Sequence, residues 1–298
     1  MTVLLIGGDG QVGWFLRHSL ARLGPMVVAT RAGNGEDLSC DLTDVESVRR
    51  LVRSTRPSLI VNAAAYTAVD AAETDLAAAE ALNGRLPALL GEEARRRDAA
   101  VIHYSTDYVF PGGDSAPRKE TDPTGPANVY GRTKLAGEQG LAASGAAHLT
   151  LRTAWVYSRR GRNFLTTMLR LARERHELRV VADQHGSPTS APLVAEATAA
   201  IASAWKGSDD PRQGIFHLTA SGGTTWHGFA SRIVERGVAC GLLANSVPVV
   251  PVASAAFPTP ARRPTWSLLD NARIQSTFAV TLPDWRDDLE RVMSALGR

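Results

Sequence analysis

Two side chains one helical turn apart are suited to move a proton. Tyr130 carries a phenol and Lys134 an ammonium, in the stretch VYGRTKLAGEQG that begins at Val129. The stretch is rich in helix formers, so the i, i+4 spacing predicts that both groups share one helix face. A phenol has an ordinary pKa of about 10, and a neighbouring cation lowers it. The pair therefore indicates an acid that protonates a carbonyl oxygen during its reduction.

A third polar side chain stands where a buried strand is expected to end. Thr106 lies in YSTDYVF, directly after the apolar run 100–102. Its hydroxyl could hydrogen-bond the oxygen being reduced. A Tyr and a Lys at this spacing occur on the surface of many helices, so the pair alone is weak evidence. Thr106 and the glycine turn described next make the pattern specific.

A glycine turn follows the first predicted strand, residues 3–6. The segment GGDGQVG spaces its glycines G-x-x-G-x-x-G before a helix predicted over 12–23. Glycines let the backbone turn and approach a ligand, and the N-H groups at the helix start attract a diphosphate. This context favours dinucleotide binding over a plain turn. The contacts are predicted at Gly7, Gly10, Gln11, Val12 and Gly13.

The end of the second predicted strand bears on the choice of cofactor. Sites that prefer NAD usually place an Asp or Glu here, whereas Thr30 and Arg31 stand at this point of the chain. An Arg can hold the extra phosphate of NADPH, so NADPH is expected, with NADH possible; the alternative is that Arg31 only faces solvent. Lys134 is expected to hold the nicotinamide ribose. Further cofactor contacts are predicted at Asp41, Leu42, Ala63, Ala64, Ala65 and Tyr130.

Alternating strands and helices must position these groups. Short apolar runs at 3–6, 26–29, 59–61 and 100–102 predict buried strands, and 12–23, 45–54 and 76–97 predict helices, the last with a kink or break at Gly84 or Pro87. This order predicts a Rossmann-like, doubly wound parallel sheet. Residues 1–152 are expected to form the cofactor-binding domain. Residues 153–298 are expected to form mainly a smaller, mixed α/β substrate-binding region, with some segments returning to the first domain.

Composition excludes several classes of protein. The chain has 298 residues, 44% hydrophobic and 21% charged, which fits an ordinary globular enzyme. No apolar run approaches the roughly 20 residues of a membrane helix, and the basic residues behind the net charge of +3 are spread out. Neither a membrane nor a nucleic-acid partner is expected. Two cysteines and no zinc-like spacing predict reduced thiols, no metal and a cytoplasmic location.

Longer motifs give the chain a family resemblance. From GGDGQVGW through NAAAYTAVD, STDYVF, NVYGRTKLAGE and PTPARRP to LPDW, it resembles the extended short-chain dehydrogenase/reductases, and among them the dTDP-4-dehydrorhamnose reductase family. The resemblance implies reduction of the 4-keto group of dTDP-6-deoxy-L-lyxo-4-hexulose to dTDP-L-rhamnose. Tyr130 would be the proton donor, Lys134 would lower its pKa, and Thr106 would polarise the keto oxygen. The four histidines His103, His148, His185 and His217 are then expected to be structural or substrate-adjacent.

The resemblance also implies contacts to the sugar nucleotide. These are Val69, Asp70, Thr106, Asp107, Tyr130, Trp155, Asn163, Gln184 and Arg262. Some family members bind Mg²⁺ across a dimer interface through glutamates, but Phe15 and Pro192 stand at two of those positions. A monomer or weak homodimer without a metal bridge is therefore expected.

Two other functions fit the same motifs. One is a 4-ketoreductase acting on another dTDP-deoxysugar, which would keep Thr106, Tyr130 and Lys134 and differ only at sugar-facing residues. The other is a non-catalytic, NADP-binding regulatory subunit. The intact set of Thr106, Tyr130 and Lys134 argues against it, because a pure binder has no need of the acid.

Overall fold

The central feature of the fold is a parallel β-sheet. A computed structural model describes residues 1–113, 115–205, 207 and 210–297. In these residues, seven strands form one parallel sheet in the order β11-β6-β5-β4-β1-β2-β3. This order, with its reversal between β1 and β4, confirms the doubly wound prediction. The strands are β1 Val3–Ile6, β2 Met26–Thr30, β3 Leu38–Ser39, β4 Leu59–Asn62, β5 Ala100–Thr106, β6 His148–Thr153 and β11 Gly214–His217.

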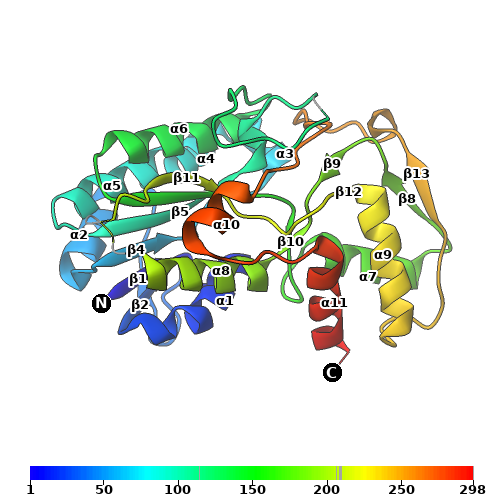
Figure 1. Cartoon of the computed structure of the whole chain (residues 1–298), viewed down its shortest axis with the longest axis horizontal. Helices are drawn as coiled ribbons and strands as arrows, with labels where there is room; N and C mark the ends of the chain where they lie inside the picture. Colours follow the sequence, from blue (N-terminus) through cyan, green and yellow to red (C-terminus); the bar gives the residue numbers. More distant parts are fainter. Residues whose placement is uncertain (114, 206, 208–209, 298) are drawn as a thin grey trace.

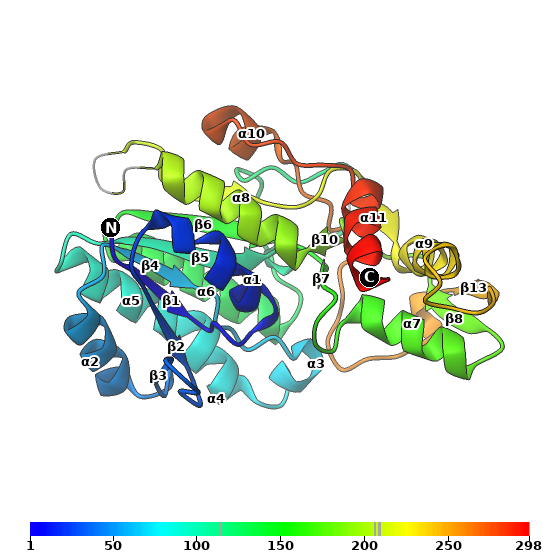
Figure 2. The same ribbon diagram turned by 90° about the horizontal axis from the view of Figure 1, so that it is seen from below.

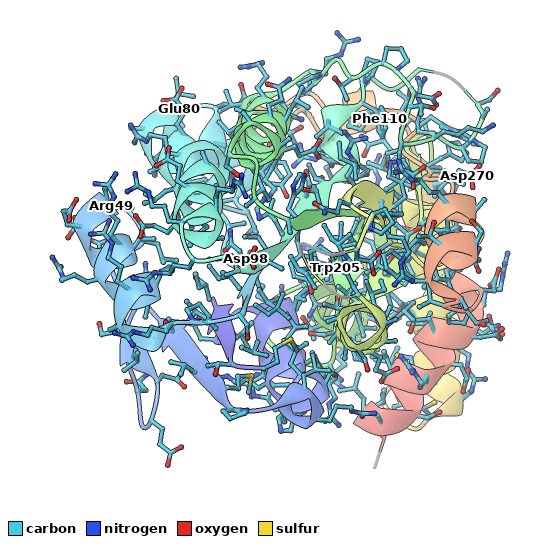
Figure 3. The ribbon with its side chains drawn as sticks, turned by 60° about the vertical axis from the view of Figure 1, so that its left-hand side comes forward. Arg49, Glu80, Asp98, Phe110, Trp205 and Asp270 are labelled. Carbon is cyan, nitrogen blue, oxygen red and sulfur yellow. The ribbon has the colours of Figure 1, made fainter. Side chains whose placement is uncertain are left out.

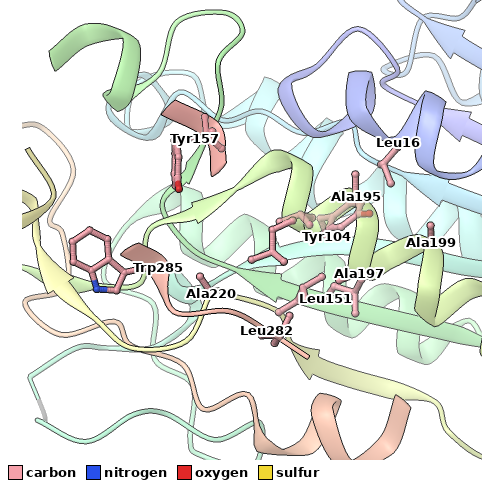
Figure 4. Packing of buried hydrophobic residues seen from close by; sticks show 14 of the residues in the cluster. Leu16, Tyr104, Leu151, Tyr157, Ala195, Ala197, Ala199, Ala220, Leu282 and Trp285 are labelled. Atoms are coloured by element: carbon pink, nitrogen blue, oxygen red, sulfur yellow. The ribbon is translucent and has the colours of Figure 1, made fainter. Parts of the chain in front are cut away.

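Helices cover both faces of the sheet (Figure 1). On one face lie α2 Val45–Thr55, α5 Leu86–Arg95 and α6 Val129–Ala143; on the other lie α1 Gln11–Ser19 and α8 Ala191–Ala204. Strand β1 serves both layers because successive side chains alternate: Leu4 and Ile6 join the α2/α5 core, whereas Val3 and Leu5 join the α1/α8 core. Figure 4 shows part of the second core, with Leu16 of α1 beside the alanines of α8.

The helix predicted over 76–97 is built in three pieces. These are α4 Leu76–Ala79, the π-turn Glu80–Arg85 and α5. The irregularity expected near Gly84 is thus a π-turn, and Pro87 breaks nothing because it lies at the start of α5, where its missing N-H costs no helical bond. Within the π-turn, the buried Asn83 side chain pairs with both the N-H and the C=O of Tyr66. The turn therefore holds the loop that follows β4.

Residues after β6 form a second group of elements and also return to the sheet. Strand β6 ends at Thr153, because Trp155 has a left-handed φ of 47° that a strand cannot continue. Strand β11 and helix α8 pack on the first domain, and β6 itself crosses the boundary placed after residue 152. Figure 2 shows α8 along the sheet and the remaining elements beyond it. The division into two functional domains stays a prediction.

The elements outside the central sheet are short strands in pairs and surrounding helices. They are α3 Val69–Ala72, β7 Val156–Tyr157, α7 Phe164–Glu174, β8 Leu178–Val181, β9 His185–Gly186, β10 Thr189–Ser190, β12 Thr224–Thr225, α9 Trp226–Ala239, β13 Val249–Val252, α10 Ala272–Phe278 and α11 Trp285–Leu296. Among the described helices, none has both the length and the apolar character needed to cross a bilayer.

A buried ion pair ties α6 to the sheet. Arg152 of β6 donates two hydrogen bonds to Glu138 of α6, at 2.9 and 2.6 Å, and each side chain is only 2% exposed. The guanidinium also lies 5.0 Å from the ring centroid of Phe110, which is buried. Arg49 of α2, in contrast, lies at the outer edge of the molecule (Figure 3). Because the Arg152 and Glu138 charges both lack water, each depends on the other.

Glu138→Gln should therefore be strongly destabilising. It leaves the Arg152 charge buried without its counter-ion, and we expect the free energy of unfolding to fall by about 3–5 kcal/mol in urea titrations. The matched control is Glu174→Gln, which breaks the exposed pair with Arg170 and should cost below about 1 kcal/mol. Equal losses in the two variants would contradict the importance of burial.

Candidate active site

The carboxyl ends of three neighbouring strands define the site. Parallel pairing sets Ile6 of β1 opposite Asn62 of β4, and Asn62 opposite His103 of β5. The chain therefore leaves β1 at Gly7, β4 at Ala63 and β5 at Thr106 along a single edge of the sheet. This is the edge where open α/β sheets bind ligands, beside the reversal of strand order.

The glycine turn after β1 is packed backbone against backbone. Gly7 has φ +80°, and a Cβ there would lie 2.7 Å from the Ala64 nitrogen; a Cβ at Gly13 would overlap the Gly7 carbonyl oxygen. Gly10 precedes α1, and no side chain in the described residues caps that helix. The first N-H groups of α1 thus remain free to hold an anion. Gln11 contributes its backbone here, since its side-chain amide donates to the Val156 carbonyl at 2.9 Å.

Two arginines lie near the end of β2, Arg31 exposed to solvent and Arg17 of α1 paired with a carboxylate. Thr30 is buried and its hydroxyl accepts from Gly33 N-H at 3.0 Å, which shapes the loop after the strand. Arg31 is exposed, and its guanidinium has no partner within the described residues. Arg17 differs, because it is engaged by the Asp37 carboxylate and the Gly8 carbonyl. Arg31 is thus free to hold a phosphate.

The two predicted adenine contacts follow β3. Asp41 is exposed and accepts from both the N-H and the hydroxyl of Thr43, which holds the pKa of its carboxyl below the usual value. Leu42 is half-buried. Their contact with a cofactor stays a prediction, and so does that of Ala65 in the half-buried loop after β4.

Thr106 and Tyr130 meet as the sequence predicts. Thr106 donates to Asp107 Oδ1 at 2.9 Å and accepts from Tyr108 N-H at 3.1 Å, and it lies near enough to Tyr130 to lower the pKa of that phenol in part. Burial nevertheless raises the pKa of Tyr130 to about 12, and the Asp107 charge adds to the rise. Lys134 is not among the groups that shift it. In this arrangement the pKa of Tyr130 therefore lies above its ordinary value and not below it as expected, because loss of water dominates.

Asp107 lies against the reacting hydroxyl groups. The residue is 2% exposed, and burial raises its pKa to about 6. The hydroxyls of Thr106 and Ser267 partly offset that shift. Asp107 is thus placed to orient the Thr106 hydroxyl, in addition to the substrate contact predicted for it.

Lys134 is held in the protein interior. The residue is 2% exposed; its ammonium donates to the Tyr104 carbonyl and lies 3.4 Å from His103 Nε2. Burial lowers its pKa to about 8, although Glu138 one turn further along α6 acts in the opposite direction. The sequence predicted for His103 only a structural or substrate-adjacent place, with no contact to Lys134. The signal available was indirect: the strand pairing that sets Asn62 opposite His103.

A segment near the C-terminus closes one side of the site. Arg263 forms two hydrogen bonds with Asp70, at 3.0 and 2.7 Å, and interacts with the Tyr108 hydroxyl, whose ring meets Tyr130 edge-on at 5.9 Å. The neighbouring Arg262, the residue predicted to bind nucleotide, is exposed, and its carbonyl accepts from Asn128 at 2.8 Å. Sequence reasoning missed Arg263, because it could not tell which of two adjacent arginines points inward.

The other predicted substrate residues lie in separate surroundings. Trp155 stacks on Trp226 with ring centroids 3.5 Å apart, over Gly186, where no Cβ would fit. Asn163 caps α7 with its side chain, and the Gln184 amide donates to Ser254 at 3.1 Å. Val69 is half-buried at the start of α3. Within the described residues, no hydrogen bond or ring contact joins these side chains to Tyr130.

No metal centre is formed by the part of the chain that the structure describes. No group of three or more His, Cys, Asp or Glu side chains gathers there to hold an ion. Phe15, at one of the positions discussed above, instead packs edge-on against Trp14 with ring centroids 4.8 Å apart.

Comparisons with known proteins identify a family and its relatives. The family model described as RmlD substrate binding domain matches residues 1–298. A dTDP-4-dehydrorhamnose reductase of Burkholderia thailandensis is 46% identical over 291 residues, covering 96% of each chain. The solved structure of such a reductase from Clostridium acetobutylicum has a TM-score of 0.90 at 31% identity, covering 100% of both chains. One from Bacillus anthracis, in complex with NADP, has a TM-score of 0.88 at 29% identity, covering 98% of both.

Gly7→Ala should weaken NADPH binding. The new Cβ would push the glycine turn away from Ala64, and we expect the Kd from fluorescence titration to rise roughly tenfold or more, on the order of 1.4 kcal/mol. Gly35→Ala is the matched control: Gly35 also has a positive φ of 65°, but nothing lies within 4 Å of its added Cβ. Both variants share the backbone strain, so equal affinities would show that the contact with Ala64 is unimportant.

Proposed function

The chain belongs to the RmlD substrate binding domain family, and we propose that it reduces the 4-keto group of dTDP-6-deoxy-L-lyxo-4-hexulose to dTDP-L-rhamnose with NADPH. The observation that carries this proposal is the near-full-length identity of 46% to a dTDP-4-dehydrorhamnose reductase. Tyr130 and Lys134, one turn apart on α6, together with Thr106 at the end of β5, supply the chemistry that such a reduction needs.

The glycine turn and the end of β2 suit a phosphorylated dinucleotide. The close backbone contacts at Gly7 and Gly13 leave no room for a Cβ, and the uncapped start of α1 offers N-H groups to a diphosphate. The unpartnered Arg31 suits the additional phosphate of NADPH, as does the absence of an acidic residue at Thr30. Ala63, Ala64 and Ala65 are small enough to let the cofactor approach. When bound, NADPH supplies the hydride that adds to C4 of the sugar.

Proton transfer is assigned to Tyr130. As negative charge develops on the keto oxygen, the Tyr130 hydroxyl gives up its proton to that oxygen, which leaves a phenolate and the product alcohol. A phenol with a pKa of about 12 remains a stronger acid than an alcohol, so the transfer is favourable. To donate a hydrogen bond to the same oxygen, the Thr106 hydroxyl turns its one proton from its present acceptor, Asp107 Oδ1, to the substrate. The Lys134 ammonium balances the phenolate and holds the ribose of the cofactor.

The sugar nucleotide is proposed to lie between this site and residues 153–298. Asp107 and the Asp70–Arg263 pair border Tyr130 and can reach the sugar. Trp155, stacked on Trp226, offers a flat aromatic wall, and Val69 an apolar contact. Asn163, Gln184 and Arg262 remain proposed contacts to the nucleotide. The side chains of Asn163 and Gln184 would have to exchange present partners to make them.

Partner and location follow from the same features. We propose a cytoplasmic enzyme, since Cys40 and Cys240 are free thiols. A monomer or weak homodimer is proposed because Phe15 and Pro192 cannot ligate Mg²⁺. Neither nucleic acid nor membrane is proposed as a partner.

The reaction is tested directly with purified protein. We expect rapid NADPH oxidation when dTDP-6-deoxy-L-lyxo-4-hexulose is supplied, with dTDP-L-rhamnose identified as the product by NMR. Slower oxidation with NADH would support the role given to Arg31. Oxidation only with another dTDP-keto-sugar would reassign the substrate, and NADPH binding without any oxidation would indicate a regulatory subunit.

Tyr130→Phe should lower turnover by about 100-fold or more, the usual range for loss of a general acid. Its NADPH affinity and melting temperature should stay close to those of the wild type. Tyr104→Phe is the control, because it removes a buried hydroxyl whose partner, Thr198 at 2.7 Å, belongs to α8 on the other side of the sheet. Near-wild-type turnover in Tyr130→Phe would refute the assignment.

A further inference from the structure

The orientation of one buried amide fixes the state of His103. The Asn62 side chain accepts from Ala64 N-H through Oδ1, at 3.2 Å, and faces His103 Nδ1 with Nδ2, at 3.1 Å. A backbone N-H can only donate, so it identifies which end of the amide is the oxygen. The Asn62 nitrogen must then donate to the ring, and His103 Nδ1 must accept. A neutral His103 consequently carries its proton on Nε2.

That proton points at the lysine of the active site. His103 Nε2 lies 3.4 Å from Lys134 Nζ, and both residues are almost fully buried. An ammonium has only donors, so a charged Lys134 meets another donor at this point. A neutral amine fits better, because its lone pair can accept the Nε2 proton. On its other side, Lys134 is held by the Tyr104 carbonyl.

We propose that His103, oriented by Asn62, is a positioning residue for Lys134: its Nε2-H directs the ammonium away from the interior, toward the cofactor ribose and Tyr130, and weakens its hold on its proton. This inference rests on the proposed reductase function. His103 reaches neither substrate nor cofactor in this role, and acts only through Lys134.

The groups around the pair are consistent with this role. Lys134 faces His103 and the Tyr104 carbonyl of β5, and on its own helix Tyr130 and Glu138 lie one turn to either side. Glu138 is already paired with Arg152 of β6. Burial above all keeps the pKa of His103 well below its usual value, and Lys134 and then His148, at the start of β6, act in the same direction. His103 therefore stays neutral across the working pH range.

Turnover is expected to fall at alkaline pH as Lys134 loses its proton. Lys134 has a pKa lowered to about 8, so the ammonium that supports Tyr130 is lost, and turnover falls, as the pH rises through this value. His103→Gln should move this alkaline limb upward by about one pH unit or more, because a glutamine oxygen accepts from the ammonium and stabilises it. Asn62→Asp should move it in the same direction, since the carboxylate accepts from Nδ1-H and turns Nε2 into an acceptor.

The first test needs no activity. Nitrogen-15 NMR of histidine-labelled protein, with His103 assigned by its loss in His103→Gln, should show the neutral Nε2-H tautomer at pH 7. The Nδ1-H tautomer or a charged ring would overturn the proposal, even if the protein proves to be a reductase. Conversely, the Nε2-H tautomer in a protein without reductase activity would leave the geometry intact and remove only its functional context.

The second test compares pH profiles of kcat. His217→Gln is the matched control, because His217 is also fully buried but lies on β11. It should at most lower the maximal kcat, and it should leave the pH at which kcat falls on the alkaline side unchanged. An upward shift in His103→Gln and Asn62→Asp, with an unmoved limb in His217→Gln, supports the proposal. If the His103→Gln and Asn62→Asp profiles fall at the same alkaline pH as the wild type and differ only in a lower maximal kcat, His103 has a purely structural role. If His103→Gln does not fold, Asn62→Asp decides alone.

Discussion

The burial of the Lys134 ammonium, away from water, is the constraint on which the rest of the site depends. Lys134 is almost fully buried, and an unpaired charge in a protein interior is costly. The surrounding strands offset only part of that cost: the Tyr104 carbonyl accepts from the ammonium, whereas the ordered pair of Asn62 and His103 turns a ring donor toward it. Glu138, the nearest acid on the same helix, is held by Arg152 instead. Lys134 thus keeps a charge that its neighbours do not neutralise, which is the charge a phenolate at Tyr130 requires.

At the glycine turn after β1, where the cofactor is proposed to bind, close backbone packing is the corresponding constraint. Glycine at positions 7 and 13 lets the turn after β1 touch both the loop after β4 and the start of α1. The loop after β4 is in turn fixed by Asn83 from the π-turn. The same loop carries Ala64, whose N-H orients Asn62. A ligand that displaced this loop would therefore also disturb the hydrogen bonds behind Lys134, so cofactor site and proton-donating site are mechanically connected.

The sequence predicted the parts of this arrangement that depend on local pattern. Apolar runs, the glycine spacing and the Tyr130–Lys134 helix gave the sheet, the turn and the shared helix face, because each has a period or a backbone requirement visible in the residues themselves. It did not predict the direction of the Tyr130 pKa, since burial is a tertiary property. Nor could it distinguish Arg263 from Arg262, or find Trp226 behind Trp155, because those contacts join segments distant in the chain.

The Asp70–Arg263 pair holds the segment around Arg263 against α3. Arg263 comes from beyond β13, yet it contacts Asp70 of α3 and Tyr108, the neighbour of Tyr130. A nearby backbone N-H, that of Ala261, adds a bond to the same carboxylate, and Asn128 before α6 holds the Arg262 carbonyl. The segment is thus held at both α3 and α6. Because α6 carries Tyr130 and Lys134, these contacts hold the Arg263 segment beside the helix on which the proposed chemistry depends, although the two lie far apart in the chain.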